Sequence, residues 1–263
     1  MAGLRGTLLE VLEEMVEATE AAGTHVQNFH TEGVDHFEGV DHFEGVDHFE
    51  GVDHFEIALD PSKPMAGIDA LMHVHETIRT VAVRRGFKAT FAVQPTLTGA
   101  LYARNGSHVH ISLNPPECAD NFLAGILGKI APLCAVGMAN FDIRKINDGH
   151  WELRCVDATA NMYLFLAVTI AAGLDGINEA KALTWKDLDQ FPLDMAPEEL
   201  SKHGIVEGMP ASLRASVSAL RIDENVRGWM GSVMHNQYVA MKTVEVNTWI
   251  HMSHQDRARK SSC

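Results

Sequence analysis

The feature that most constrains the fold is a perfect tandem repeat in the N-terminal part of the chain. The hexapeptide GVDHFE occurs four times in succession, at residues 33–38, 39–44, 45–50 and 51–56. Because six is an even number, an extended chain places the same side chains of every copy on the same face. A helix turns through roughly 600° over six residues, so successive copies would face different directions. The repeat therefore favours extended or irregular structure.

The composition of the repeat favours a solvated loop. Each copy carries one aspartate and one glutamate, so the block contributes −8 to the net charge of −14. Each copy also has a single phenylalanine, which gives little apolar area to bury. We expect an irregular ribbon or loop that is the least ordered internal segment. The imidazoles and carboxylates leave a second interpretation open, in which the repeat binds metal.

Composition excludes several classes of protein. The chain has 263 residues, of which 46% are hydrophobic, enough for the core of one large domain or two small ones. The acidic balance argues against a nucleic-acid partner, because phosphate binding needs a basic face. Without an 18-residue apolar run or a basic leader, no membrane partner is expected. Four scattered cysteines without a CxxC pair fit core positions in a reducing, cytoplasmic setting.

Hydrophobic periodicity predicts an α+β fold, in which a curved antiparallel sheet is backed by helices. After about residue 184 the chain becomes polar and helical, with Leu213, Val217 and Leu220 on one stripe, and the stretch from Val244 has little pattern. The expected strands are 25–29, 57–60, 88–93, 107–113 and 150–157. The expected helices are 4–22, 66–85, 122–138 with an interruption near Pro132, and 161–177.

Two predicted strands carry polar side chains on one face. His108, His110 and Ser112 alternate on one strand, which makes a plausible edge for metal and phosphate, although exposed histidines are also common. Glu152 and Arg154 alternate on a later strand. Such a pair is usually a surface ion pair, and it gains meaning only if it meets the His108 face in space.

Other polar residues have weaker signals. Glu32 and Glu56 flank the repeat and are either ligands of a hard divalent cation or solvated. Asn105-Gly106 is typical of a turn. His73 and His75 lie about 200° apart on a helix, so we expect two surface residues. The sequence contains no nucleophile elbow, Walker loop or dinucleotide fingerprint.

Three stretches in this order resemble the catalytic domain of glutamine synthetase, in particular the glutamine-synthetase-like domains of fungal and bacterial proteins. The resemblance covers roughly residues 10–230. The stretches are FHTE at 29–32 followed by HFEI at 54–57, KATFAVQP at 88–95 followed by NGSHVHISL at 105–113, and IRK at 143–145 followed by HWELRCVDATANMYLFLAVTIAAGLDGI at 150–177.

The resemblance implies a fold, a reaction and a division of the chain. The reaction is ATP-dependent ligation of ammonia or an amine to the γ-carboxylate of glutamate through γ-glutamyl phosphate. It implies Mg²⁺ or Mn²⁺ and ATP, the small molecules glutamate and ammonia, and a possible homo-oligomer. The implied parts are 1–31 as helix and lead-in strand, 32–56 as repeat insertion, 57–243 as partial catalytic domain and 244–263 as irregular tail.

The resemblance also implies roles for single residues. Arg154 is the catalytic residue, facing the reacting carboxylate of the substrate. The metal ligands are Glu32 and Glu56 for a first ion and His108 and Glu152 for a second. The ATP contacts are His110, Ser112 and Arg144, and the contacts to the amino-acid substrate are Asn105 and Gly106.

Several positions depart from the family pattern. Gln94 stands where the family has a lysine, and the motif before His108 is two residues shorter. Asp142 runs directly into Ile143, where the family has a few dozen residues that include a substrate-binding arginine. We also expect the family's small N-terminal β-grasp domain to be absent. Three hypotheses follow: an impaired ligase, an inactive structural or regulatory relative, and a metal-binding protein built on the repeat.

Overall fold

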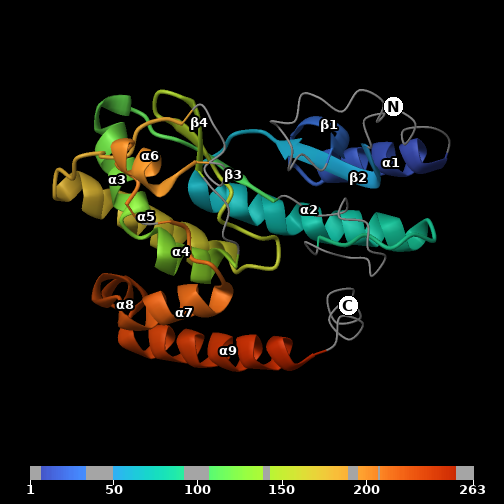
Figure 1. The fold of residues 1–263 in the computed structure, drawn as a ribbon. Coiled ribbons are helices and arrows are strands. Elements are labelled where there is room, and N and C mark those ends of the chain that lie inside the picture. The colour runs from blue at the N-terminus through green and yellow to red at the C-terminus, as the bar shows by residue number, and fades with distance from the viewer. Residues whose placement is uncertain are drawn as a thin grey trace. The chain divides into compact units, whose positions relative to one another are not determined.

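The computed structural model describes residues 7–33, 50–91, 107–138, 143–188, 195–206 and 208–252, without the side chains of 31–33 and 50–54. The chain divides into two compact units (Figure 1). Unit 1 is residues 1–105 with 254–263, and unit 2 is residues 106–253. The boundary between the two units lies near residue 105. The partial catalytic domain expected from the sequence begins at residue 57 instead.

The described residues of unit 1 form two helices and one antiparallel strand pair. Its apolar core joins Val11, Leu12 and Met15 of α1 to Val74 and Ile78 of α2. Pro64 opens α2, a position where the missing backbone N–H costs nothing. The elements are α1 (Thr7–Ala21), β1 (Val26–Gly33), β2 (Glu50–Leu59) and α2 (Pro64–Arg84).

The fourth copy of the repeat lies in β2, so the predicted extended structure is confirmed for residues 51–56. The strand continues into Ile57 and Leu59, which pack against the core of unit 1. This packing pins the register, in which His30 lies opposite Glu56. Residues 34–49 are outside the described part of the chain, and the loop expected there stays a prediction.

Unit 2 contains a three-stranded antiparallel sheet in the order β3-β5-β4, together with helices. The mixture of helices and antiparallel strands confirms the predicted α+β class. The elements are β3 (Val109–Ser112), the 3₁₀ helix η1 (Pro116–Cys118), α3 (Ala119–Leu127), α4 (Ile130–Gly137), β4 (Ile143–Asn147), β5 (His150–Leu153), α5 (Met162–Asn178), α6 (Pro197–Lys202), α7 (Leu213–Ile222), α8 (Glu224–Met230) and α9 (Ser232–His251).

One face of β5 is fixed by packing against helices. Trp151 and Leu153 are buried, and the Trp151 ring stacks on Phe122 of α3 with a centroid distance of 6.4 Å. Helix α3 in turn lies close against α5, because Gly125 has no side chain. A Cβ atom there would collide with the carbonyl oxygen of Ala172. Since strand side chains alternate, the other face of β5 carries His150, Glu152 and Arg154.

Two expectations about local structure are wrong, and a third is confirmed with a small shift in position. Lys88–Phe91, the described part of the strand expected at 88–93, has no regular structure, although Phe91 packs against the unit 1 core. The interruption expected near Pro132 in the apolar helix at 122–138 is present, but the chain bends by 75° between Leu127 and Ile130, so Pro132 lies within the first turn of α4. A proline is tolerated there because its N–H would have no helical partner. Residues 244–251, expected to be irregular, belong to α9.

The apolar helices also bear on membranes. Among the described helices none is long and apolar enough to cross a bilayer alone, and the bent pair 116–127 and 130–137 meets the length and composition test only jointly.

The predicted single curved sheet that carries Glu56 with His108 and Glu152 stays a prediction. Glu56 belongs to the sheet of unit 1, and the positions of the two units relative to one another are not determined.

His75 is buried, so the expectation of a surface residue is wrong for this position, whereas His73 is exposed. The His75 ring stacks on Phe91 with a centroid distance of 4.0 Å. Burial, together with the nearby guanidinium of Arg79, lowers the pKa of His75 to about 4. The helix places His75 on the core side because Val74 and Ile78 are buried on the same side of α2.

We expect this imidazole to make stability depend on pH. Its pKa is lower in the folded protein than in the unfolded chain, where it is about 6.5, so protonation favours unfolding as the pH falls from 6.5 to 4. The free energy of unfolding should lose roughly 2–3 kcal/mol between pH 7 and pH 4 from this group. Urea titrations of His75→Phe should lack that loss, and those of the exposed control His73→Phe should retain it. Equal pH dependence in both variants contradicts the assignment.

The even period of the repeat makes a second prediction. Deleting residues 39–44 leaves an identical sequence leading into β2, so the thermal midpoint should change by less than about 2 °C. Inserting one alanine between Glu56 and Ile57 instead moves Ile57 and Leu59 to the opposite face. The midpoint should then fall by at least about 5 °C. A large loss on deletion, measured by calorimetry, would show that copy number itself supports the fold.

Candidate active site

Glu152 lies at the centre of the unit 2 sheet. It is on β5, the middle strand, and its backbone pairs with His110 of β3 on one side and with Arg144 of β4 on the other. Its side chain points away from the face on which Trp151 and Leu153 pack. Strand pairing therefore brings together residues that lie more than forty positions apart in the sequence, across β3 and β5.

The Glu152 carboxylate is buried beside two guanidiniums and one imidazole. Only 5% of the residue is exposed. Its Oε1 lies 3.2 Å from Arg154 Nε and 3.9 Å from His108 Nδ1, and its Oε2 lies 3.9 Å from Arg144 Nη1. A buried carboxylate needs such partners, because transferring its charge away from water is costly. The predicted meeting of the Glu152–Arg154 face with the His108 face is therefore present.

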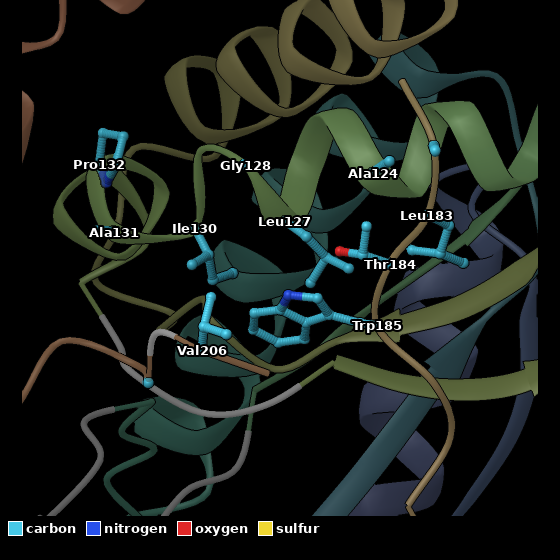
Figure 2. A pocket seen from close by; sticks show the side chains of 12 residues that line it. Ala124, Leu127, Gly128, Ile130, Ala131, Pro132, Leu183, Thr184, Trp185 and Val206 are labelled. Atoms are coloured by element: carbon cyan, nitrogen blue, oxygen red, sulfur yellow. The ribbon is translucent and has the colours of Figure 1, made fainter. Parts of the chain in front are cut away.

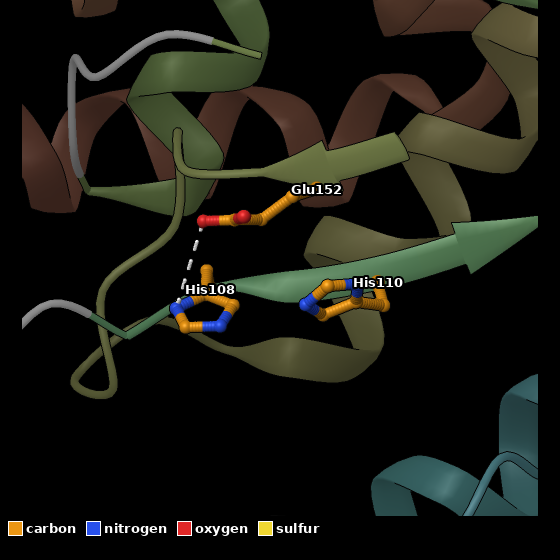
Figure 3. Close-up of side chains that lie close together, drawn as sticks. All are labelled: His108, His110 and Glu152. Carbon is orange, nitrogen blue, oxygen red and sulfur yellow. Dashed lines mark ion pairs between the residues drawn. The ribbon is translucent and has the colours of Figure 1, made fainter. Parts of the chain in front are cut away.

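His108, His110 and Glu152 form a group whose potential ligand atoms all lie within 4.8 Å of one another. Figure 3 shows the carboxylate reaching from β5 towards His108, which directly precedes β3, with His110 of β3 further along and the His108–Glu152 ion pair drawn as a dashed line. The rings of His108 and His110 meet edge to face at 5.3 Å. Two imidazoles and a carboxylate are a donor set that divalent transition metals accept.

His150 also lies at this site, although it was not among the residues predicted from the sequence. This residue begins β5, and its Nε2 lies 2.9 Å from His110 Nδ1, within hydrogen-bonding distance. The two rings meet edge to face at 5.2 Å. The signal was present, because His150 precedes Glu152 by the same spacing of two that separates Glu152 from Arg154.

The remaining predicted site residues are distributed as follows. Ser112 ends β3, is exposed and pairs with His150 in the sheet register. Glu56 lies in β2 of unit 1, where its Oε2 is 3.7 Å from His30 Nε2. Glu32 belongs to β1, and its side chain is outside the described part of the structure. Asn105 and Gly106 also lie outside the described residues.

Two motif residues after Arg154 have structural tasks. Asp157 forms a turn in which its Oδ1 accepts a hydrogen bond from the Thr159 backbone N–H at 2.6 Å. Asn161 caps α5, because its side-chain oxygen accepts the Leu164 N–H at 3.1 Å. The turn and the cap direct the chain from the end of β5 into α5, which packs against α3.

A separate cavity of about 230 Å³ lies in unit 2 (Figure 2). Leu127, Ile130, Leu183, Trp185 and Val206 form much of its wall, and none of the described residues that line it has an ionisable side chain. The lining residues do not include any of the predicted site residues that the structure describes.

The family model described as "Glutamine synthetase, catalytic domain" matches residues 6–142 and 134–260 of the chain. The chain belongs to this family. The two matched segments overlap at residues 134–142. This overlap ends at Asp142, directly before Ile143, where the family pattern has additional residues. The family predicted from the sequence motifs is thereby confirmed.

Curated relatives agree with this assignment. The chain is 30% identical to protein fluG of Emericella nidulans, over 90% of this chain and 28% of that protein. It is 25% identical to the gamma-glutamylpolyamine synthetase of Streptomyces coelicolor, over 92% of this chain and 57% of that protein. It is also 25% identical to the glutamine synthetase of Methanocaldococcus jannaschii, over 90% of this chain and 57% of that protein. The chain thus spans between 28% and 57% of the length of these relatives.

Solved structures show the same fold. The structure described as apo GmaS without ligand matches 97% of this chain and 63% of its own, with a TM-score of 0.71 and 22% identity. A novel glutamine synthase homolog matches 96% of this chain and 62% of its own, with a TM-score of 0.71 and 20% identity. These similarities confirm the glutamine-synthetase-type fold.

Proposed function

We propose that the chain carries a glutamine-synthetase-type site for ATP-dependent ligation of ammonia or an amine to the γ-carboxylate of glutamate, and that its turnover is slow or absent. The observation that carries this proposal is the buried Glu152 carboxylate in contact with His108 and Arg154. Such an arrangement can hold a divalent cation and an anionic substrate side by side. The family assignment supplies the reaction, and the geometry supports the roles below.

His108 and Glu152 would hold a divalent cation, Mg²⁺ or Mn²⁺, which when bound neutralises charge on the transferring phosphoryl group. The two residues fit this task because their ligand atoms are already close, at 3.9 Å. Glu32 and Glu56 are proposed ligands of a first cation. These roles remain proposals that rest on the family and on the donor chemistry.

The cationic and hydroxyl side chains would bind the anionic reactants. Arg144, at the edge of the Glu152 group, is proposed to contact the ATP phosphates together with His110 and Ser112. Arg154 is proposed to orient the reacting carboxylate of glutamate, because a guanidinium can hold a carboxylate through two parallel hydrogen bonds. Asn105 and Gly106 are proposed to contact the amino-acid substrate.

Two sequence features favour weak activity or an inactive relative. Gln94 replaces the lysine of the family pattern, which removes one cation from the phosphate side. The short connection at Asp142–Ile143 leaves no room for the family's substrate-binding arginine. Loss of correct substrate orientation can raise a barrier by several kcal/mol, on the order of 7–11 when orientation is lost completely. The second candidate function is therefore a structural or regulatory protein that retains the nucleotide site.

The proposed setting follows from the same chemistry. The cysteines in the described part of the chain are not joined in disulfides, and two of them are buried, which suits a reducing, cytoplasmic environment. The proposed acceptor is ammonia or a larger amine, since one relative bears the name of a gamma-glutamylpolyamine synthetase. A homo-oligomer is also proposed, on the family's precedent alone.

A paired binding and turnover assay tests the proposal. The purified chain should be stabilised thermally by ATP with Mg²⁺ or Mn²⁺, and should form glutamine or a γ-glutamyl amide slowly or not at all. In Glu152→Gln and His108→Ala, the ATP concentration needed for half of the maximal thermal stabilisation should rise at least about 10-fold. The exposed control Glu199→Gln on α6 should behave like the parent protein.

Two outcomes would change the conclusion. Rapid glutamine formation that Glu152→Gln abolishes would show that the short connection and Gln94 are tolerated, and the predicted impairment would be wrong. Absence of both turnover and nucleotide-dependent stabilisation, in a protein with native circular dichroism, would overturn the proposed site itself.

A further inference from the structure

We propose that two copies of this chain associate through the outward face of α9, as an antiparallel pair of α9 helices related by a two-fold axis near Met241. The outward face consists of the exposed residues Val233, Met234, Gln237, Ala240, Met241, Val244 and Thr248. The inference does not depend on the ligation chemistry. It gives the homo-oligomer, which so far rests on the family alone, a specific contact in this chain.

The opposite side of α9 is already covered within unit 2. His235 Nε2 lies 2.8 Å from the Leu220 carbonyl oxygen of α7, and the Tyr238 hydroxyl donates to the Ala135 carbonyl of α4 at 3.1 Å. Figure 1 shows α7 and α8 along one side of α9. The buried residues of the helix are His235, Tyr238, Val239, Lys242 and Val246. These contacts fix which side of α9 faces the core of unit 2 and which side faces away from it.

The outward face is apolar although it is exposed. Val233, Met241 and Val244 are 70%, 53% and 66% exposed, and spacings of three and four along the helix place them on one stripe. A surface helix usually carries charged side chains on its solvent side. In α9 the only lysine is Lys242 and the only acidic residue is Glu245, and these two pair with each other at 2.8 Å, off the stripe.

The charge of the chain points to a second copy as the partner. Each copy carries a net charge of −14, so two copies repel each other across most of their surfaces. The outward face of α9 contains no charged residue, and two copies meet there with the least repulsion. A basic partner would gain its attraction from the acidic surfaces elsewhere and not from this face.

The order of residues along the stripe suits pairing with itself. A two-fold axis between Ala240 and Met241 places Gln237 opposite Val244 of the second copy, and Val233 opposite Thr248. The small side chain of Ala240 leaves space for Met241 of the second copy, as a hole accepts a knob in packed helix pairs. The same face therefore serves both copies, which is the condition for a closed dimer.

The area is large enough for a specific contact. The four apolar side chains Val233, Met234, Met241 and Val244 together expose on the order of 400 Å² per copy, at the upper range of patches on monomeric proteins. With the polar and small residues between them, covering the face in both copies removes roughly 1,000 Å², the lower end of specific interfaces.

Sedimentation velocity on the full chain tests the surface. The parent chain should form a concentration-dependent dimer, which higher salt concentration strengthens because it screens the repulsion between acidic copies. Met241→Glu places two carboxylates at the axis and should raise the dissociation constant at least about 10-fold. The control Met65→Glu makes the same change at a residue of α2 that is 60% exposed, and it should associate like the parent.

Mixing two variants separates a lost contact from a lost fold. Met241→Lys alone should also weaken association, whereas an equimolar mixture of Met241→Lys and Met241→Glu should associate at least about 10-fold more tightly than either variant alone. A variant that had simply misfolded would not be rescued in this way. A monomeric parent chain, an oligomer that Met241→Glu leaves intact, or a mixture without rescue overturns the proposal.

This proposal and the proposed function fail separately. If ATP with Mg²⁺ stabilises a chain that stays monomeric, the α9 contact is wrong and the ligase-type site stands. If the chain associates through α9 but ATP with Mg²⁺ has no effect on its thermal stability, the contact stands and the proposed function is wrong.

Discussion

The site depends on one buried carboxylate in the middle of a three-stranded sheet. Two guanidiniums and an imidazole lie beside the Glu152 carboxylate and compensate for its removal from water. The partners come from three strands, so they meet only when β3, β4 and β5 pair in the observed register. A shift of one residue on any strand would turn its polar side chains into the packed face. The carboxylate and the sheet register therefore depend on each other.

The helices behind the sheet hold that register. Trp151 and Leu153 alternate with the polar residues of β5 and are buried, and the Trp151 ring stacks on Phe122. Gly125 lets α3 approach α5 closely, which gives this support a dense core. Rigid support matters to the proposed chemistry, because binding groups that are already positioned need not be reordered when charge develops.

The repeat shows how a low-complexity insertion can join a folded unit. Its last copy is part of β2, where the period of six matches the period of two of a strand. The non-repeated residues Ile57 and Leu59 pack on the core of unit 1 and thereby distinguish this register from one that is displaced by a whole copy. Identical copies alone would not define the register, since a slip of six residues leaves each side chain on its face.

Local patterns in the sequence determined the class of fold, the alternating faces of β3 and β5, the start of the helix near Asn161 and the family, because each depends on residues that are close in the chain. They also placed His108 and Glu152 together through the family motifs. Tertiary structure decided what lies next to those faces. The burial of His75 under Phe91 and the contact of His150 with His110 depend on segments that lie elsewhere in the chain. The helix α9 continues to His251 although the sequence there has no strong local pattern. Packing supports it, because Tyr238 and Val246 of α9 are buried. Periodicity shows which side of an element is apolar, whereas the partner that covers that side is set by the rest of the fold.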